Sequence, residues 1–371
     1  MKIAVFHNFP PGGGKRTVFE QVKGLINLGH VIDVYELSNP QSYFWDLSAL
    51  KCRMFKFDFS LFASHPPFLT RLEKDWRNLF VLSKVHRKIA QLINNGGYNV
   101  ALIHSDKYTE SPFILRYLTI PHIYHCHEWL RLGYEKELAF TERVILPKKI
   151  YELLTRQIRK LVDKSNAKSA QTIITNSKFT QNNILTAYDR QAVICHSGVD
   201  TDIFRPFTHK KKHILFMGQK NFVGGYEFVQ KFFSLLPPKI KPRLQSFGFP
   251  KGRPDIHNDH LLAQAYSSAL ATLCVSYNEP FGLKSIESMA CGTPVLAVNE
   301  GGYPESVIDG KNGWLLPRNP DLFAQKIIQL IKYPEISVQT GKAARKHVVR
   351  NWTWKRHVDQ LEEILKHAAQ S

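Results

Sequence analysis

Short apolar runs rich in β-branched residues alternate with helix-like segments along both halves of this chain, and this alternation constrains the fold more than any other feature. In the first half the strand-like runs cover residues 3–6, 31–37, 99–104, 122–125 and 172–175, and in the second half they cover 214–217, 243–247, 271–275, 295–298 and 314–316. Strands that alternate with helices in this way form parallel, doubly wound sheets. The sequence therefore predicts an α/β protein with two such sheets.

A charged segment at residues 198–212, which contains Pro206, separates the two series, so we place the linker there. We predict a first domain over residues 1–205 and a second over residues 206–351. With 371 residues and a hydrophobic share of 43%, the chain is long enough for two packed cores. The last segment, 352–371, contains a further helix.

The chain carries 50 basic and 31 acidic residues, a formal net charge of +19, which indicates an anionic partner. Nucleic acid, anionic lipid and phosphorylated ligands all carry negative charge, so all three classes of partner are compatible with this net charge. The sequence has no zinc finger, helix-turn-helix pattern or RNA-binding aromatic signature, so we predict no nucleic-acid partner. The five cysteines are scattered without CxxC spacing, which indicates reduced thiols in a cytoplasmic protein. No apolar run is long enough to span a bilayer, and the first residues lack the apolar stretch of a signal peptide.

Two glutamates, Glu279 and Glu287, flank the start of a helix that follows a strand-like run in the second half. Open α/β sheets bind ligands beyond the carboxyl ends of their strands. The backbone N–H groups that open this helix can hold a phosphate or polar hydroxyls, and the two carboxylates can accept hydrogen bonds from sugar hydroxyls. Those N–H groups belong to Phe281, Gly282 and Leu283. The alternative is that the glutamates only favour the helix dipole and lie on a solvated face.

Three glycines, Gly12, Gly13 and Gly14, lie between the first strand and the first helix. Glycine-rich loops of this kind hold phosphates through backbone N–H groups. This is not a Walker A loop, because Phe9 and Arg16 stand where glycine and Ser/Thr are needed, and its spacing does not match a GxGxxG dinucleotide fingerprint. The alternative is a flexible surface turn.

The sequence His-Cys-His-Glu at 125–128 ends a strand of the first half and contains metal-ligand side chains. Successive strand residues point to opposite faces, and no second cluster has zinc-like spacing, so we expect no metal. His127 is better interpreted as a strand-end histidine that bonds a hydroxyl or helps to transfer a proton. The acidic DxD sequence at 200–202 lies in the linker, where turn or capping roles are expected.

Residues 148–164 form a candidate amphipathic helix. Its apolar residues fall on one stripe: Ile150, Leu153, Leu154, Ile158, Leu161 and Val162. Its basic residues lie mostly outside that stripe: Lys149, Arg156, Arg159, Lys160 and Lys164. One interpretation packs the helix on the first domain and leaves a solvated basic face. The other has the helix adhere to anionic lipid.

Together these segments resemble the retaining glycosyltransferases of family 4, which have the GT-B fold of two Rossmann-like domains facing across a cleft. The resemblance covers nearly the whole chain. In the first half it is carried by the glycine loop, GHVIDV at 29–34, HE at 127–128, NSKFT at 176–180, SGVD at 197–200 and FRP at 204–206. In the second half it is carried by Glu-x7-Glu at 279–287, GTPV at 292–295, GGYPE at 301–305 and DGKNG at 309–313. Each short motif is weak alone, but their order together with Glu-x7-Glu is specific.

The resemblance implies donor-site roles for residues at the matching positions. Glu279 would bind hydroxyls of the donor sugar, assisted by the backbone N–H groups at 281–283, and Glu287 would hold the ribose of the nucleotide. His127 would lie near the transferred sugar, and Gly13 and Gly14 would let the first domain close over the diphosphate. Enzymes of this kind need no metal or other cofactor, and their terminal helix, here within 352–371, usually packs back on the first domain.

The sequence departs from the family after the first strand of the second domain. Family members usually have an arginine there, followed by a Lys-Gly pair, and these cations offset the charge of the departing diphosphate. Here Gln219 stands at the arginine position and Gly224 near the lysine position. One lost donor of this kind can cost about a hundredfold in rate or more. Four cations are candidates for substitution: Lys220, Lys284 at the helix start, and Lys15 and Arg16 from the glycine loop. The alternative is weakened or lost activity.

The sequence thus predicts a metal-independent hexosyltransferase that moves a sugar from a UDP-, GDP- or ADP-sugar to a glycan or lipid-linked acceptor, as in polysaccharide or lipopolysaccharide biosynthesis. The alternative is a non-catalytic subunit that binds a nucleotide sugar or glycan and supports a partner. We expect a cytoplasmic protein, with the anionic inner face of the membrane as a further partner. Acceptor recognition is expected in the loops at 38–75 and 107–114.

Overall fold

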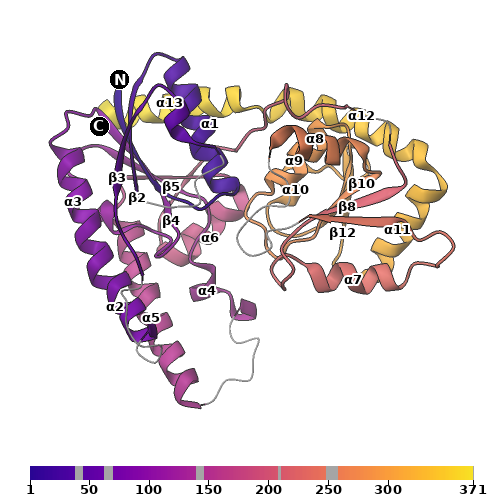
Figure 1. The fold of residues 1–371 in the computed structure, drawn as a ribbon, viewed down its shortest axis with the longest axis horizontal. Coiled ribbons are helices and arrows are strands. Elements are labelled where there is room, and N and C mark those ends of the chain that lie inside the picture. Colours follow the sequence, from indigo (N-terminus) through magenta and orange to yellow (C-terminus); the bar gives the residue numbers. More distant parts are fainter. Residues whose placement is uncertain (38–44, 62–69, 139–145, 208–209, 248–257, 371) are drawn as a thin grey trace. The chain divides into compact units, whose positions relative to one another are not determined.

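The computed structural model describes residues 1–37, 45–61, 70–138, 146–207, 210–247 and 258–370 of the chain (Figure 1). Its contacts divide the chain into two compact units. Unit 1 consists of Met1–Asn176, Thr180–Cys195 and Val358–Ser371, and unit 2 consists of Ser177–Phe179 and His196–His357. Each unit is built around one sheet of parallel strands, which confirms the α/β class predicted from the alternation.

The sheet of unit 1 has seven parallel strands in the order β3-β2-β1-β4-β5-β6-β7. The strands are β1 (Lys2–Asn8), β2 (Val31–Leu37), β3 (Arg53–Phe57), β4 (Val100–Asp106), β5 (His122–Cys126), β6 (Thr172–Thr175) and β7 (Val193–Ile194). The strand order reverses between β1 and β4, which is the doubly wound arrangement. Five of these strands were expected from the sequence, and β3 and β7 at the two edges are additional.

The main helices of unit 1 are α1 (Gly13–Asn27), α2 (Thr70–Trp76), α3 (Leu82–Asn94), α4 (Arg131–Tyr134), α5 (Leu146–Lys168), α6 (Lys178–Tyr188) and α13 (Trp354–Gln370). Helices α1 and α13 lie side by side (Figure 1), and their leucines Leu25 and Leu361 belong to one buried cluster. A Cβ at Gly24 would lie 2.4 Å from a methyl carbon of Val358, so glycine permits this close packing. The end of the chain is therefore part of the core of unit 1.

The sheet of unit 2 has five parallel strands in the order β12-β11-β10-β8-β9. The strands are β8 (His213–Met217), β9 (Arg243–Phe247), β10 (Ala271–Cys274), β11 (Val295–Val298) and β12 (Gly313–Leu316), and all five were expected. The helices are α7 (Tyr226–Ser234), α8 (Asp259–Ser268), α9 (Leu283–Ala290), α10 (Tyr303–Ser306), α11 (Pro320–Lys332) and α12 (Pro334–Asn351). Figure 1 shows α8 and α9 on one side of this sheet and α7 and α11 on the other. Because helices cover both faces of the sheet, every residue of the central strands β10 and β11 is buried.

The chain passes between the units at different residues from those expected from the sequence. It leaves unit 1 after Cys195 rather than after Arg205, and it returns after His357 rather than before Trp352. The physical reason is a backbone pairing inside unit 2, where the N–H of Val199 donates to the carbonyl oxygen of Trp352 at 3.0 Å. The outgoing and returning segments are therefore held together within unit 2.

Candidate active site

In unit 2 the strand order changes at β8, and the loops after β8 and β10 lie against each other there. The N–H of Tyr277 donates to the carbonyl oxygen of Val223 at 2.8 Å. Gly225 has a φ of +78°, and a Cβ at this position would lie 2.2 Å from the carbonyl oxygen of Val275. The carboxyl ends of strands at such a switch point are where open α/β sheets bind ligands. The loop that contains Glu279 therefore begins at the expected place in the sheet.

Glu279 lies in the loop after β10, with its side chain partly exposed. One carboxylate oxygen lies 4.0 Å from the amine nitrogen of Lys284, which in turn lies 3.4 Å from the hydroxyl of Ser276. The Glu279 backbone is fixed from behind, because its carbonyl oxygen accepts a hydrogen bond from the N–H of Gly302 at 2.8 Å. Gly301 adopts a φ of +63°, and a Cβ there would lie 2.5 Å from the same oxygen. Gly301 and Gly302 thus support the backbone of the loop, while the Glu279 carboxylate stays partly exposed to solvent.

Helix α9 begins at Leu283, and Gly282 precedes it with a φ of +94°. A Cβ at Gly282 would lie 2.6 Å from the ring of Tyr303, so both the backbone angle and the space require glycine. The ring of Phe281 is buried and lies 5.5 Å from the ring of Trp352. The first N–H groups of a helix lack acceptors within the helix and favour anions. The fold therefore fixes the three predicted N–H groups at the start of α9.

Glu287 lies inside α9 and is buried, in contrast to Glu279. One of its carboxylate oxygens accepts a hydrogen bond from the hydroxyl of Tyr266 on α8 at 3.0 Å. The solvated-face alternative is therefore wrong for Glu287. Tyr266 was missed by sequence reasoning, since nothing in its local sequence indicates a partner on another helix.

The cations near this loop differ in their surroundings. Lys220 is exposed on the loop after β8, with its amine 5.9 Å from the centre of the Tyr226 ring, whereas Lys284 lies next to Glu279. Arg318, which the sequence did not suggest, donates to the carbonyl oxygen of Val275 at 3.0 Å and pairs with Glu300 at 2.7 Å. Arg318 therefore braces the end of β10, with Glu300 offsetting its charge.

In unit 1 the two predicted glycines are the first residues of α1, which follows β1 after a loop of residues 9–12. Gly13 is the first residue of the helix, and a Cβ at Gly14 would lie 2.9 Å from the ring of Phe9. The Phe9 ring meets the imidazole of His127 edge to face, with ring centres 4.8 Å apart. Gly14 and His127 thus contact the same phenylalanine, so the structure brings these two predicted residues of unit 1 into one region.

His127 follows β5 and belongs to a cluster of three buried or nearly buried imidazoles. Its Nε2 lies 3.0 Å from Nδ1 of His104, a residue of β4 that the sequence analysis did not single out. The rings of His125 and His127 are stacked, with centres 4.1 Å apart, and Gln21 lies 3.0 Å from His125 Nδ1. The ligand atoms of the three histidines all lie within 4.8 Å of one another, and imidazoles are ligands that transition metals accept. Our expectation of no metal remains a prediction. The contact between His104 Nδ1 and His127 Nε2 orients the His127 ring.

Two acids of unit 1 have a raised pKa. Burial raises the pKa of Asp163 to about 7, against the effect of hydrogen bonds from Tyr188 and Ser111. Burial, and then the charges of Glu128 and Asp163, raise the pKa of Glu110. Both shifts arise first from burial, an effect that sequence patterns do not report.

Lys15 and Arg16, expected as possible replacements for the missing cation pair, are buried within unit 1. Burial lowers the pKa of Lys15, opposed by the charges of Glu36 and Asp46. The guanidinium carbon of Arg16 lies 4.6 Å from the centre of the Trp45 ring. Both cations are thus engaged in the packing of unit 1, which favours Lys220 and Lys284 as the substitutes.

Two other expectations concern loops. Asp200 accepts hydrogen bonds from the N–H groups of Asp202 at 3.0 Å and Ile203 at 3.1 Å, which confirms a turn role for the DxD sequence. Residues 38–44 and 62–69, within the loop expected to recognise the acceptor, lie outside the described residues.

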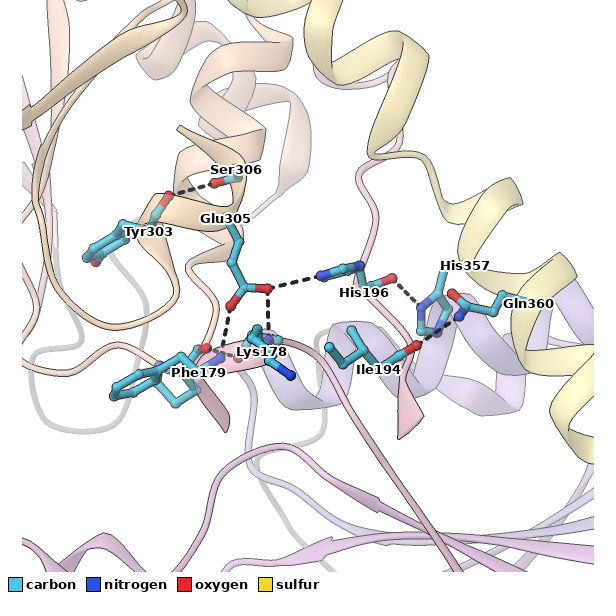
Figure 2. A network of polar contacts seen from close by, with 11 residues as sticks. Lys178, Phe179, Ile194, His196, Tyr303, Glu305, Ser306, His357 and Gln360 are labelled. Atoms are coloured by element: carbon cyan, nitrogen blue, oxygen red, sulfur yellow. Dashed lines mark hydrogen bonds and ion pairs between the residues drawn. The ribbon is translucent and has the colours of Figure 1, made fainter. Parts of the chain in front are cut away.

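The motif GGYPE ends with a carboxylate that joins three segments of unit 2 (Figure 2). Glu305 accepts hydrogen bonds from the backbone N–H groups of Lys178 at 2.8 Å and Phe179 at 3.0 Å. It also lies 3.0 Å from Nε2 of His196. Burial would raise the pKa of Glu305, but the hydrogen bonds from His196 and the two N–H groups hold it below its usual value. Glu305 thus fixes the chain segment 177–179 as part of unit 2.

Family models match both halves of the chain. The model described as Glycosyltransferase Family 4 matches residues 11–203, and the model described as Glycosyl transferases group 1 matches residues 256–347. A D-inositol 3-phosphate glycosyltransferase of Nocardiopsis dassonvillei is 40% identical over 106 residues, which is 28% of this chain and 24% of that protein. The chain thus matches about a quarter of the length of that relative. An uncharacterised glycosyltransferase of Methanocaldococcus jannaschii is 22% identical across 99% of this chain and 98% of its own length.

Two solved structures share the architecture across nearly the whole chain. Sucrose-phosphate synthase from Thermosynechococcus elongatus superposes with a TM-score of 0.73 at 18% identity, covering 99% of this chain and 98% of its own. Anabaena HepE, in complex with UDP and glucose, superposes with a TM-score of 0.70 at 16% identity and 99% coverage of both chains. These likenesses show the fold, which is the GT-B class with two Rossmann-like units.

Proposed function

The chain belongs to Glycosyltransferase Family 4, and from this membership we propose that it moves a hexose from a nucleoside diphosphate sugar to a hydroxyl of a glycan or lipid-linked acceptor. We propose that the anomeric configuration is retained and that neither a metal nor another cofactor takes part. The observation that carries this proposal is the start of α9, where the partly exposed Glu279 carboxylate lies 4.0 Å from the Lys284 amine, at a helix terminus that favours a phosphate.

Unit 2 would hold the donor. In our proposal Glu279 accepts hydrogen bonds from the sugar hydroxyls, and the N–H groups of Phe281, Gly282 and Leu283 meet the diphosphate. Glu287 accepts a hydrogen bond from the ribose, in addition to that from Tyr266. Because HepE was solved with UDP and glucose, a UDP-sugar is the first donor to test.

Unit 1 would contribute His127 and the glycine loop. His104 orients the His127 ring through the 3.0 Å contact, so that His127 can bond the transferred sugar. Gly13 and Gly14 present backbone N–H groups at the start of α1, where they can approach the diphosphate. The departing phosphate oxygen would itself take the proton of the acceptor hydroxyl, so a separate base is not needed.

The negative charge on the departing diphosphate requires cations, and we propose Lys220 and Lys284 for this role. Preorganised charges at such a position stabilise the transition state. The Lys284 amine lies 4.0 Å from Glu279 and 3.4 Å from the hydroxyl of Ser276, and Lys220 lies on the loop after β8. For the cell, we propose a cytoplasmic protein that meets the anionic inner face of the membrane, where lipid-linked acceptors are found.

A thermal-shift screen against UDP, GDP, ADP and their sugars tests the donor proposal. A ligand that binds only the folded protein raises its stability by about 2.7 kcal/mol at a hundred times its dissociation constant. We expect one nucleotide, and the sugars that carry it, to raise the unfolding temperature. If none of them shifts the midpoint at millimolar concentrations, the proposed donor site is wrong.

One observation favours the second candidate, a non-catalytic subunit that binds a nucleotide sugar for a partner. A Cβ at Gly224 would lie 2.1 Å from the carbonyl oxygen of Gln219, so this backbone has no room for the lysine that family members usually carry nearby. The two candidates differ in turnover. Release of nucleoside diphosphate by the purified chain alone would exclude the second, and nucleotide binding without any release would favour it.

A further inference from the structure

Helix α5 turns its apolar side outward. Five large aliphatic residues form this α5 face: Ile150, Leu153, Leu154, Ile158 and Leu161. Leu154 is 61% exposed and Leu161 is 69% exposed, and the others are between 43% and 50% exposed. An amphipathic helix of a globular protein normally turns such a stripe toward the core. Helix α5 does pack on unit 1, as one interpretation expected, but not through this apolar stripe.

Polar contacts hold the opposite side of α5 against unit 1. Asp163 accepts a hydrogen bond from the N–H of Ser111 at 2.8 Å, and the amide of Asn166 donates to the carbonyl oxygen of Ser111 at 2.7 Å. The hydroxyl of Tyr151 donates to Asp75 on α2 at 2.6 Å. Since these contacts lie along the length of the helix, they fix its rotation and keep the α5 face outward.

The other long amphipathic helices of the same unit behave normally. Leu361 and Leu365 of α13 are fully buried, and so are Ile89 and Ile93 of α3. Helices α13 and α3 thus bury their apolar sides, whereas α5 exposes its own, and apolar surface gathered in this way marks an interaction site.

The charges around the α5 face select the kind of surface that it meets. At 100° per residue, four basic residues fall along one border of the face: Lys149, Arg156, Lys160 and Lys164. The acids of the described part of the helix, Glu152 and Asp163, lie on the other side, paired with Arg71 and bonded to Ser111 respectively. Apolar residues bordered by cations match an anionic lipid surface. A second copy of this chain would bring the same positive border and the same net charge of +19.

A second set of exposed apolar residues lies on the elements next to α5. Leu72, Trp76 and Phe80 are 55% to 57% exposed and recur every four residues along α2 and the π-helical turn η2 (Arg77–Val81). Aromatic side chains of this kind favour the membrane–water interface. Among the described residues, no helix is long and apolar enough to cross a bilayer. These exposed residues are suited to a contact in which the helices lie along the surface of a membrane.

We propose that the α5 face lies in the interfacial layer of an anionic membrane, with its basic border on the lipid phosphates. This inference goes further than the membrane contact proposed above. It rests on the proposed function in one respect only, because a lipid-linked acceptor would be the reason for the protein to bind a membrane. It assigns the contact to named side chains of one helix.

Co-sedimentation of the purified full chain with vesicles tests this assignment without any donor or acceptor. We expect strong binding to phosphatidylcholine vesicles that contain phosphatidylglycerol and weak binding to phosphatidylcholine alone. The double variant Leu154→Glu, Leu161→Glu should lower binding to the anionic vesicles by about tenfold or more, because two side chains that the proposal places in the lipid become charged. Removing cations with Lys160→Gln and Lys164→Gln should cost about fivefold per charge on anionic vesicles alone.

The matched control is Leu92→Glu with Leu185→Glu, which changes two leucines that are 44% and 43% exposed on α3 and α6 and gives the same net charge. This control should bind anionic vesicles nearly as well as the native chain. Equal binding by the α5 double variant and the native chain would overturn the assignment, as would no binding by the native chain. A dimer that the α5 double variant dissociates, with vesicle binding unchanged, would assign the face to a second copy instead. Nucleotide binding in the thermal-shift screen is measured separately, so the donor proposal can fail or hold independently.

Discussion

At the scale of single residues, the two glutamates of the Glu-x7-Glu motif have different environments and therefore different tasks. Glu279 is partly exposed and lies near a lysine, whereas Glu287 is buried and accepts a hydrogen bond from Tyr266. A buried carboxylate is costly unless hydrogen bonds compensate it. The hydrogen bond from Tyr266 thus compensates the burial of Glu287, and the exposure of Glu279 is what our proposal uses when it assigns this acid to the donor sugar.

The exchange Glu279→Gln keeps the size of the side chain and removes its charge. Since hydrogen bonds to a charged acceptor are about twice as strong as those to a neutral one, the variant should bind the intact nucleotide sugar about tenfold more weakly. Binding of the free nucleoside diphosphate should not change, because Glu279 is assigned to the sugar. Calorimetric titration of both ligands checks this, and an equal loss for both would reassign the residue.

His357 provides a pH-dependent test of the packing in unit 2. It is buried, its Nδ1 lies 2.7 Å from the carbonyl oxygen of His196 (Figure 2), and burial lowers its pKa to about 4. Between pH 6.5 and about 4 the unfolded chain takes up a proton that the folded chain does not, so stability falls as the pH falls through this window. The loss amounts to about 3 kcal/mol.

Urea unfolding of the native chain and of His357→Gln, followed across this pH range, measures the effect. Glutamine keeps an N–H donor for the His196 carbonyl but does not titrate. The variant should therefore show a shallower decline with falling pH. Parallel declines in the two proteins would show that His357 does not contribute to the acid sensitivity.

At the scale of elements, the start of α9 depends on a single glycine. Gly282→Ala introduces a methyl group 2.6 Å from the Tyr303 ring at a φ of +94°. We expect a loss of about 1–3 kcal/mol in stability and weaker nucleotide binding, because the N–H groups of the first turn shift. Gly310→Ala is the matched control, since Gly310 also has a positive φ, of +70°, but a Cβ there meets nothing within 4 Å.

Thermal unfolding with and without the nucleotide separates the two effects. The control Gly310→Ala should lose only the part of the stability that comes from backbone strain at a positive φ, and it should bind the nucleotide normally. If Gly282→Ala behaves like Gly310→Ala in both measurements, the tight helix start is not required for the site.

Sequence patterns predicted the elements of the site better than its contacts. The strand before Glu279 and the glycine at the start of α9 follow from apolar runs and turn chemistry, which are local signals. The partners His104, Tyr266 and Arg318 lie on other elements, and their contacts depend on strand order and helix packing that no local pattern reports. Strand β7 was missed because it has two residues, and β3 because the charged residues Arg53 and Lys56 interrupt its apolar residues, as is common in edge strands. In α5, periodicity revealed the apolar stripe but not which side faces the core.

At the scale of the whole molecule, the proposed roles are divided between two units with separate cores. Unit 2 contains Lys220, Glu279, Lys284 and Glu287, so the affinity for the nucleotide sugar should be a property of unit 2. Unit 1 contains the glycine loop and His127, together with the α5 face assigned to the membrane. This division allows binding of the donor, transfer of the sugar and attachment to lipid to be tested by separate variants.

The most direct test of the central claim is the release of nucleoside diphosphate from a nucleotide sugar by the purified chain, compared with Glu279→Gln. Hydrolysis or transfer should be measured for UDP-, GDP- and ADP-sugars without added metal. We predict release from one donor class by the native chain and a rate lower by about a hundredfold in the variant, because the sugar is no longer held in its reactive orientation. Equal rates for the two proteins, or no release from any donor, would contradict it.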